Sequence, residues 1–165
     1  MKHLFLLRHA KSSWDYPELS DFERPLNKRG KHDAPLMAGV MIKHKVIPDI
    51  ILSSPATRAA MTAKAVTEIL RVPDDGLMFN NEIYEASPSR LLDIIRLIDD
   101  SLHKVLLVGH NPGLTGLANI LTDHHVDNIP TAGLFGLSIN IPKWKNINEK
   151  AGKFLFFETP KNNRP

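Results

Sequence analysis

Four arginine and histidine side chains each follow a short aliphatic segment of the chain. They are Arg8 and His9 after residues 3–7, Arg58 after residues 49–52 and the polar turn 53–57, and His110 after residues 104–108. A guanidinium group holds two oxygens in a fork and imidazoles supply further donors, so together these groups suit a tetrahedral dianion such as phosphate. A neutral imidazole can also attack phosphorus directly, which makes His9 a candidate nucleophile.

The three aliphatic segments are predicted to be the central strands of a sheet. Their nearly continuous Leu, Ile and Val content is typical of strands covered on both faces. Apolar residues with helical spacing mark three longer segments, 59–70, 91–98 and 114–121. This alternation indicates an α/β fold, a three-layer sandwich whose mostly parallel sheet has helices on both faces. Ligands of such folds bind at the carboxyl ends of the strands, so the four side chains should converge there.

Chain length and two proline positions indicate the domain organisation and the expected helix starts. The 165 residues, of which 42% are hydrophobic, predict one domain over residues 1–165. Pro88 behind Ser87 and Pro112 behind Asn111 each look like a first helical residue that follows a capping side chain.

The segment 27–44 has a helical pattern with a proline inside it. The helix therefore either begins near Asp33, with Pro35 in its first turn, or is kinked at Pro35. Less regular residues follow in the last third of the chain. Further strands are expected at residues 133–141 and 153–157, and a frayed end at residues 160–165.

Composition excludes several classes of function. The absence of cysteine rules out disulfides, thiolate metal sites and a cysteine nucleophile. A formal charge of +3 without a dense basic block argues against nucleic acid as a partner. No segment is long enough to span a membrane, and residues 1–8 are too short for a signal peptide, so a cytoplasmic protein is expected. His124, His125 and Asp127 are interpreted as a polar loop rather than a metal site.

Six short motifs lie in order along nearly the whole chain. They are Arg8-His9-Ala10-Lys11-Ser12, Asp21-x-x-Arg24-Pro25-Leu26, Arg29-Gly30, Ser53-Ser54-Pro55-x-x-Arg58-Ala59-x-x-Thr62-Ala63, Tyr84-Glu85-Ala86 and Val108-Gly109-His110-Asn111-Pro112. Together they resemble the histidine phosphatase superfamily, also called phosphoglycerate mutase-like, and its short SixA-type branch of phosphohistidine phosphatases. The family usually has glycine where Ala10 stands, and alanine excludes a positive φ that only glycine tolerates well.

The resemblance implies a phosphatase that needs no metal or organic cofactor. His9 would attack the phosphoryl group and form a phosphohistidine, which water then hydrolyses to inorganic phosphate. Arg8, Arg58 and His110 would bind the three equatorial oxygens and stabilise the charge spread over them in a loose transition state.

The proton donor for the leaving group stays open among three carboxyl groups. An alkoxide leaving group needs a general acid, and Glu82 corresponds best to the glutamate that larger family members use. If its segment is a strand, Glu82 and Glu85 lie on opposite faces, and Glu85 is the neighbouring candidate. Asp21 is a further candidate, or else forms a structural ion-pair cluster with Arg24 and Arg29. Imidazole is a better leaving group than an alkoxide, so a phosphohistidine substrate needs an acid less.

The resemblance also implies a protein substrate that carries phosphohistidine. The chain has no room for the large insertions that cover the pocket in mutases and sugar bisphosphatases, so an uncovered site could admit another protein. The alternatives are a phosphatase of small phosphate esters and a catalytically silent phosphate-binding module. Ser12 and Asn111 are further candidates to contact the substrate. Trp14 and Tyr16 either wall the pocket or simply pack.

Overall fold

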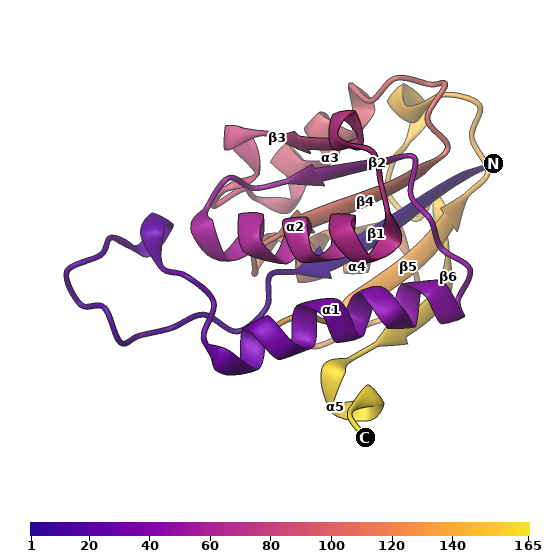
Figure 1. Ribbon diagram of the computed structural model, residues 1–165. Helices are drawn as coiled ribbons and strands as arrows, with labels where there is room; N and C mark the ends of the chain where they lie inside the picture. The colour runs from indigo at the N-terminus through magenta and orange to yellow at the C-terminus, as the bar shows by residue number, and fades with distance from the viewer.

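One six-stranded sheet organises the protein, which is described by a computed structural model over residues 1–165 (Figure 1). The sheet has the order β3-β2-β4-β1-β5-β6, and only β5 runs against the other strands. The predicted central strands are β2, β4 and β1, which lie side by side in the middle of the sheet. The strands are β1 (Lys2–Arg8), β2 (Ile50–Ser53), β3 (Leu77–Phe79), β4 (Lys104–Gly109), β5 (Leu134–Ile139) and β6 (Gly152–Glu158).

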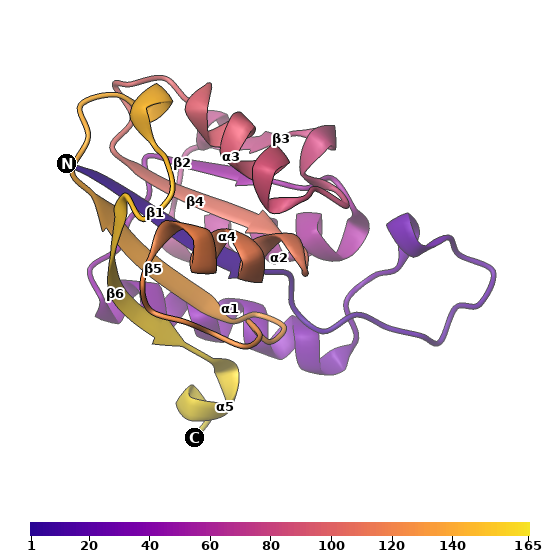
Figure 2. The same cartoon turned by 180° about the vertical axis from the view of Figure 1, so that it is seen from behind.

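Two pairs of helices cover the two faces of the sheet. Figure 1 shows α1 and α2 in front of it, and Figure 2, from behind, shows α3 and α4. The mostly parallel three-layer sandwich expected from the sequence is confirmed. None of the helices is long and apolar enough to cross a membrane. The helices are α1 (Lys28–Lys43), α2 (Thr57–Leu70), α3 (Pro88–Arg96), α4 (Gly113–Leu121) and α5 (Pro160–Asn163), with short 3₁₀ turns at Asp21–Glu23, Asp74–Gly76, Asn81–Ile83 and Trp144–Asn146.

Side chains of β1 alternate between two separate hydrophobic cores. Phe5 and Leu7 belong to the core beneath α1 and α2, whereas Leu4 and Leu6 belong to the core beneath α3 and α4. All four side chains are almost completely buried. Because both faces of the strand are covered, its sequence is continuously apolar, and its carboxyl end is held rigidly where Arg8 and His9 follow.

The helix starts agree only in part with the sequence. Ser87 accepts a hydrogen bond from the Arg90 amide and Pro88 is the first residue of α3, as predicted. The prediction for α4 is wrong by one residue, because Pro112 precedes the helix and forms a cis peptide bond with Asn111. The Asn111 side chain still accepts a hydrogen bond from an amide in the first turn of α4.

Helix α1 and the chain end also differ from expectation. The helix begins at Lys28 behind the cap Asn27 and continues through Pro35, so of the two predicted alternatives the start near Asp33 is wrong. The predicted frayed end is wrong as well, because residues 160–163 form α5 and Arg164 pairs with the buried carboxylate of Asp33 at 2.6 Å. A buried carboxylate needs such a partner, and this one comes from the end of the chain.

Gly30 in the first turn of α1 fits the helix against the loop that carries His9. A Cβ atom at Gly30 would lie 2.1 Å from the carbonyl oxygen of Lys11, which is a backbone atom with little freedom to move. At Gly39 in the same helix, a Cβ atom would meet nothing within 4 Å. The close approach at Gly30 therefore fixes the distance between α1 and the turn after β1.

The substitutions Gly30→Ala and Gly39→Ala test this contact. We expect Gly30→Ala to lower the free energy of unfolding by about 1–3 kcal/mol, since the backbone must shift to admit the methyl group. Gly39→Ala should raise it by about 0.5–1 kcal/mol, because alanine is the better helix former. Urea unfolding of the two variants measures both effects, and equal changes in the two would contradict the packing at Gly30.

Candidate active site

The side chains predicted to converge do line one pocket, of about 240 Å³, at the carboxyl ends of β1, β2 and β4. Residues 9–27, between β1 and α1, extend away from the body of the protein beside this end of the sheet (Figure 1). The predicted residues in the lining are Arg8, His9, Ser12, Arg58, His110 and Asn111, and the lining is completed by Lys11, Trp14, Arg24 and Thr131. Neither Glu82 nor any other carboxylate belongs to it.

His9 has an unprotonated Nε2 atom. Its Nδ1 atom lies 2.8 Å from the carbonyl oxygen of Ala10, and because a carbonyl can only accept, Nδ1 carries the proton. Arg58 donates from Nε to the Nε2 atom of His9 over 3.4 Å. The lone pair of the neutral ring is therefore on Nε2, next to a guanidinium group.

A threonine joins the turn after β1 to the first turn of α2. The amide of Ala10 donates to Oγ1 of Thr62 over 2.9 Å, and the Thr62 hydroxyl donates to the carbonyl oxygen of Arg58 over 2.7 Å. Ala10 is fully buried and does not have a positive φ. This turn therefore requires no glycine, and alanine at this position leaves the backbone unstrained.

Asp21 fixes the guanidinium group of Arg58. Nη2 of Arg58 donates to Oδ2 of Asp21 over 3.0 Å, and Nη1 donates to the backbone carbonyl of the same residue over 2.6 Å. Tyr84 donates its hydroxyl to Oδ2 over 2.6 Å, and Arg24 donates to Oδ1 over 3.1 Å. These donors, first the Tyr84 hydroxyl and then Arg58, lower the pKa of Asp21 to about 2. Asp21 is therefore ionised, and it holds Arg58 in place.

His110 and Arg8 complete the group of donors. The His110 ring lies 5.1 Å from the His9 ring, centroid to centroid, and its Nε2 atom is 2.8 Å from the hydroxyl oxygen of Ser54. Nη1 of Arg8 donates to the carbonyl oxygen of Ile129. Nε of Arg8 and Nδ1 of His110 are buried without a hydrogen-bond partner. Leaving such groups unpaired costs free energy, which is typical of a site prepared for a ligand.

Burial keeps both histidines of the pocket neutral. Together with the smaller effect of the charges of Arg58 and Arg8, it lowers the pKa of His9 to about 3 and that of His110 to about 4. At neutral pH the positive charge of the pocket therefore comes from arginine and lysine alone. Such a site attracts an anion while its imidazole stays unprotonated.

Glu82, a general acid expected from the sequence, does not line the pocket, so this prediction is corrected. Its carboxylate lies 3.6 Å from Arg90, and both Glu82 and Glu85 line a separate hollow on the surface. The segment is no strand, because residues 81–83 form a 3₁₀ turn and Glu85 has a φ of 58°. The strand alternation used to place these side chains therefore does not apply.

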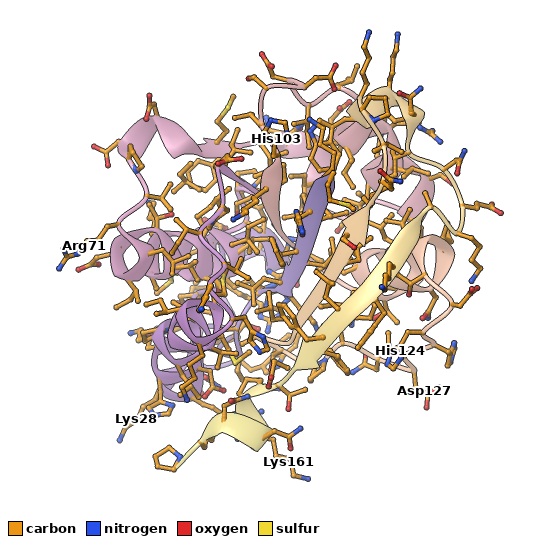
Figure 3. The ribbon with its side chains drawn as sticks, turned by 90° about the vertical axis from the view of Figure 1, so that its right-hand side faces the viewer. Lys28, Arg71, His103, His124, Asp127 and Lys161 are labelled. Atoms are coloured by element: carbon orange, nitrogen blue, oxygen red, sulfur yellow. The ribbon has the colours of Figure 1, made fainter.

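Other histidines and acids stand apart from the pocket. The His124 ring lies 3.6 Å from the Phe154 ring, whereas His125 is exposed and pairs with Asp127 at 2.9 Å. Figure 3 shows His124 and Asp127 near each other at the edge of the molecule. These three residues lie in the segment between α4 and β5, as the prediction of a polar loop requires. Arg29 pairs with Asp33, so it takes no part in the predicted cluster around Asp21.

Four lining residues were not predicted as part of the phosphate site. The sequence allows Trp14 either to wall the pocket or simply to pack, and it favours a structural ion pair for Arg24. Arg24 does pair with Asp21, and it also donates to Ser12 inside the pocket. Lys11 was visible only as part of the motif after His9. Thr131 carries no signal in the sequence, because it reaches the site only through the loop before β5.

Titration of the two pocket histidines tests their neutrality. We expect NMR signals of the His9 and His110 rings to show no titration between about pH 8 and 5. Both pKa values lie below the ordinary value of 6.5, so below pH 6.5 the unfolded chain binds protons that the folded chain does not bind. The free energy of unfolding should therefore fall as the pH drops from 6.5 toward 4. A titration of either ring near pH 6.5 would contradict the assignment.

Comparison with known proteins agrees with this geometry. Residues 4–78 match the model of the histidine phosphatase superfamily (branch 1). An uncharacterized protein of Mycobacterium tuberculosis is 31% identical over 166 residues, which cover 94% of this chain and 100% of the relative. A chloroplastic protein of Arabidopsis thaliana is 33% identical over 133 residues, which cover 73% of this chain and 59% of the relative.

Solved structures of SixA proteins share the whole fold. A structure assigned to the phosphohistidine phosphatase SixA of Agrobacterium tumefaciens has a TM-score of 0.82 at 28% identity, covering 96% of this chain and 98% of the other. The protein histidine phosphatase SixA complexed with tungstate has a TM-score of 0.84 at 23% identity, covering 98% and 99%. This chain therefore belongs to the histidine phosphatase superfamily, in its SixA-type branch, and is a phosphatase.

Proposed function

We propose that this phosphatase hydrolyses phosphohistidine on another protein through a phosphohistidine on its own His9. The observation that carries the proposal is the chemistry of the pocket lining, which combines a neutral imidazole and several cations with no carboxylic acid. A pocket of this kind can bind and transfer a phosphoryl group, but it cannot easily protonate an alkoxide. Its best substrate therefore has a leaving group that departs without being protonated by the enzyme.

In the first step, Nε2 of His9 attacks phosphorus from the side opposite the leaving group. The new Nε2–P bond forms as the P–N bond of the substrate breaks, and the electron pair of that bond returns to the leaving imidazole. This imidazole departs neutral if its other ring nitrogen already carries a proton. Arg8, Arg58 and His110 contact the equatorial oxygens and stabilise their charge.

Phosphorylation at Nε2 leaves the His9 ring with a positive charge, because Nδ1 keeps its proton. The Ala10 carbonyl, which accepts from Nδ1, stabilises this charge and holds the ring in line. A water molecule then attacks phosphorus and the Nε2–P bond breaks. The electron pair of that bond returns to Nε2, and the proton of the water goes to the departing inorganic phosphate.

Asp21 is no substitute for the missing acid. Its pKa of about 2 means that it holds no proton to donate at neutral pH, and its oxygens are occupied by Arg58, Arg24 and Tyr84. The related proteins described as SixA phosphohistidine phosphatases support the same substrate class for this chain. The cytoplasmic location expected from the sequence is part of the same proposal.

A comparison of substrates tests this function. We expect kcat/KM for a phosphohistidine protein to exceed that for sugar phosphates and aryl phosphates by at least about a hundredfold, the usual contribution of a general acid. Glu82→Gln should leave both activities unchanged, since Glu82 lies outside the pocket. Faster hydrolysis of esters than of phosphohistidine, or loss of ester activity in Glu82→Gln, would contradict the proposal.

A further inference from the structure

Trp14 is the most exposed aromatic side chain of the protein, and it lines the phosphate pocket. It is 73% exposed, and the guanidinium carbon of Arg24 lies 3.3 Å from the centre of its ring. One face of the indole is thus backed by a cation, while most of the side chain remains open to solvent. A large apolar ring gains little from this position in folding alone, because it buries so little of its surface.

Arg24 is held so firmly that it fixes the orientation of the indole. Its guanidinium group is buried, with 8% of the residue exposed, and each of its three nitrogens donates a hydrogen bond. Nε donates to the Ser13 carbonyl over 3.1 Å, Nη1 to the Asp21 carboxylate over 3.1 Å, and Nη2 to the Ser12 hydroxyl. With its edges occupied, the guanidinium plane presents a face, and Trp14 stacks on that face.

Trp14 lies at the open side of the pocket. In an in-line transfer the leaving group departs on the side of phosphorus opposite Nε2 of His9. His9 is 7% exposed and Trp14 is 73% exposed, so the indole occupies the open side of the pocket that both residues line. A planar ring that leaves phosphorus in this direction meets an indole face that is already oriented.

We propose that Trp14, backed by Arg24, forms a stacking platform for the imidazole ring of the substrate phosphohistidine. This inference rests on the proposed function and names the group that selects the substrate. Stacked aromatic rings attract each other beyond the area they bury, and a rigid platform loses little entropy when the second ring docks. The platform therefore favours a planar leaving group over an aliphatic alcohol. No carboxylic acid lines the pocket, so the platform is the group that distinguishes the two.

Two compounds with the same scissile bond test the platform. Free phosphohistidine and phosphoramidate both contain a P–N bond, but only phosphohistidine has a ring to stack. We expect Trp14→Ala to lower kcat/KM for phosphohistidine by about fivefold to tenfold, mainly through a higher KM, and to lower kcat/KM for phosphoramidate by a clearly smaller factor. Trp14→Phe keeps an aromatic face and should restore most of the loss. Tyr16→Ala is the matched control, an exposed aromatic of the same loop outside the pocket lining.

Three results would overturn the platform. Equal losses on phosphohistidine and phosphoramidate in Trp14→Ala would mean that the indole shapes the phosphate site through Arg24. If kcat/KM for free phosphohistidine is unchanged in Trp14→Ala, the indole does not bind the ring. This holds even if the variant loses activity on a phosphohistidine protein. If the unchanged enzyme hydrolyses neither free P–N compound, the platform fails, and the proposed function fails with it only if a phosphohistidine protein is not hydrolysed either.

Discussion

The hydrogen bond from Nδ1 of His9 to the Ala10 carbonyl determines what the rest of the site can do. It places the proton on Nδ1 and the lone pair on Nε2, toward which Arg58 donates. The bond depends on the turn after β1, which is held by Thr62 and by the close approach of Gly30. A single imidazole is thus oriented by a buried strand between two cores, by the hydrogen bond to Thr62 and by the close approach of Gly30.

In the pocket, the positive charge and the neutral imidazole belong to different side chains. Arg8 and Arg58 supply positive charge beside His9, and their charge helps to keep the imidazole unprotonated. Asp21 balances the charge of Arg58, lies outside the pocket lining and is itself stabilised by Tyr84. This arrangement suits a dianion without offering a proton, and it is the basis of the proposal that the substrate carries a labile P–N bond.

The sequence predicted the parts of the site that lie next to long buried strands. Continuous aliphatic segments reveal such strands, and the residues after them must meet at one edge of the sheet. Three features escaped this reasoning because distant segments decide them. Strand β3 has only three residues and its last two are exposed, Glu82 and Glu85 lie in irregular backbone, and Arg164 orders the chain end by pairing with Asp33, 131 residues away. Trp14 and Arg24 likewise gain their role from the folding of their loop.

The most direct test of this account is the position of the phosphoryl group on the enzyme during turnover. After rapid acid-free quenching with a labelled substrate, NMR of the trapped protein distinguishes phosphorus on Nε2 from phosphorus on Nδ1 or on another residue. We expect an acid-labile phosphate on Nε2 of His9, and none in His9→Asn. Phosphate on Nδ1, on another residue, or unchanged in His9→Asn would contradict it.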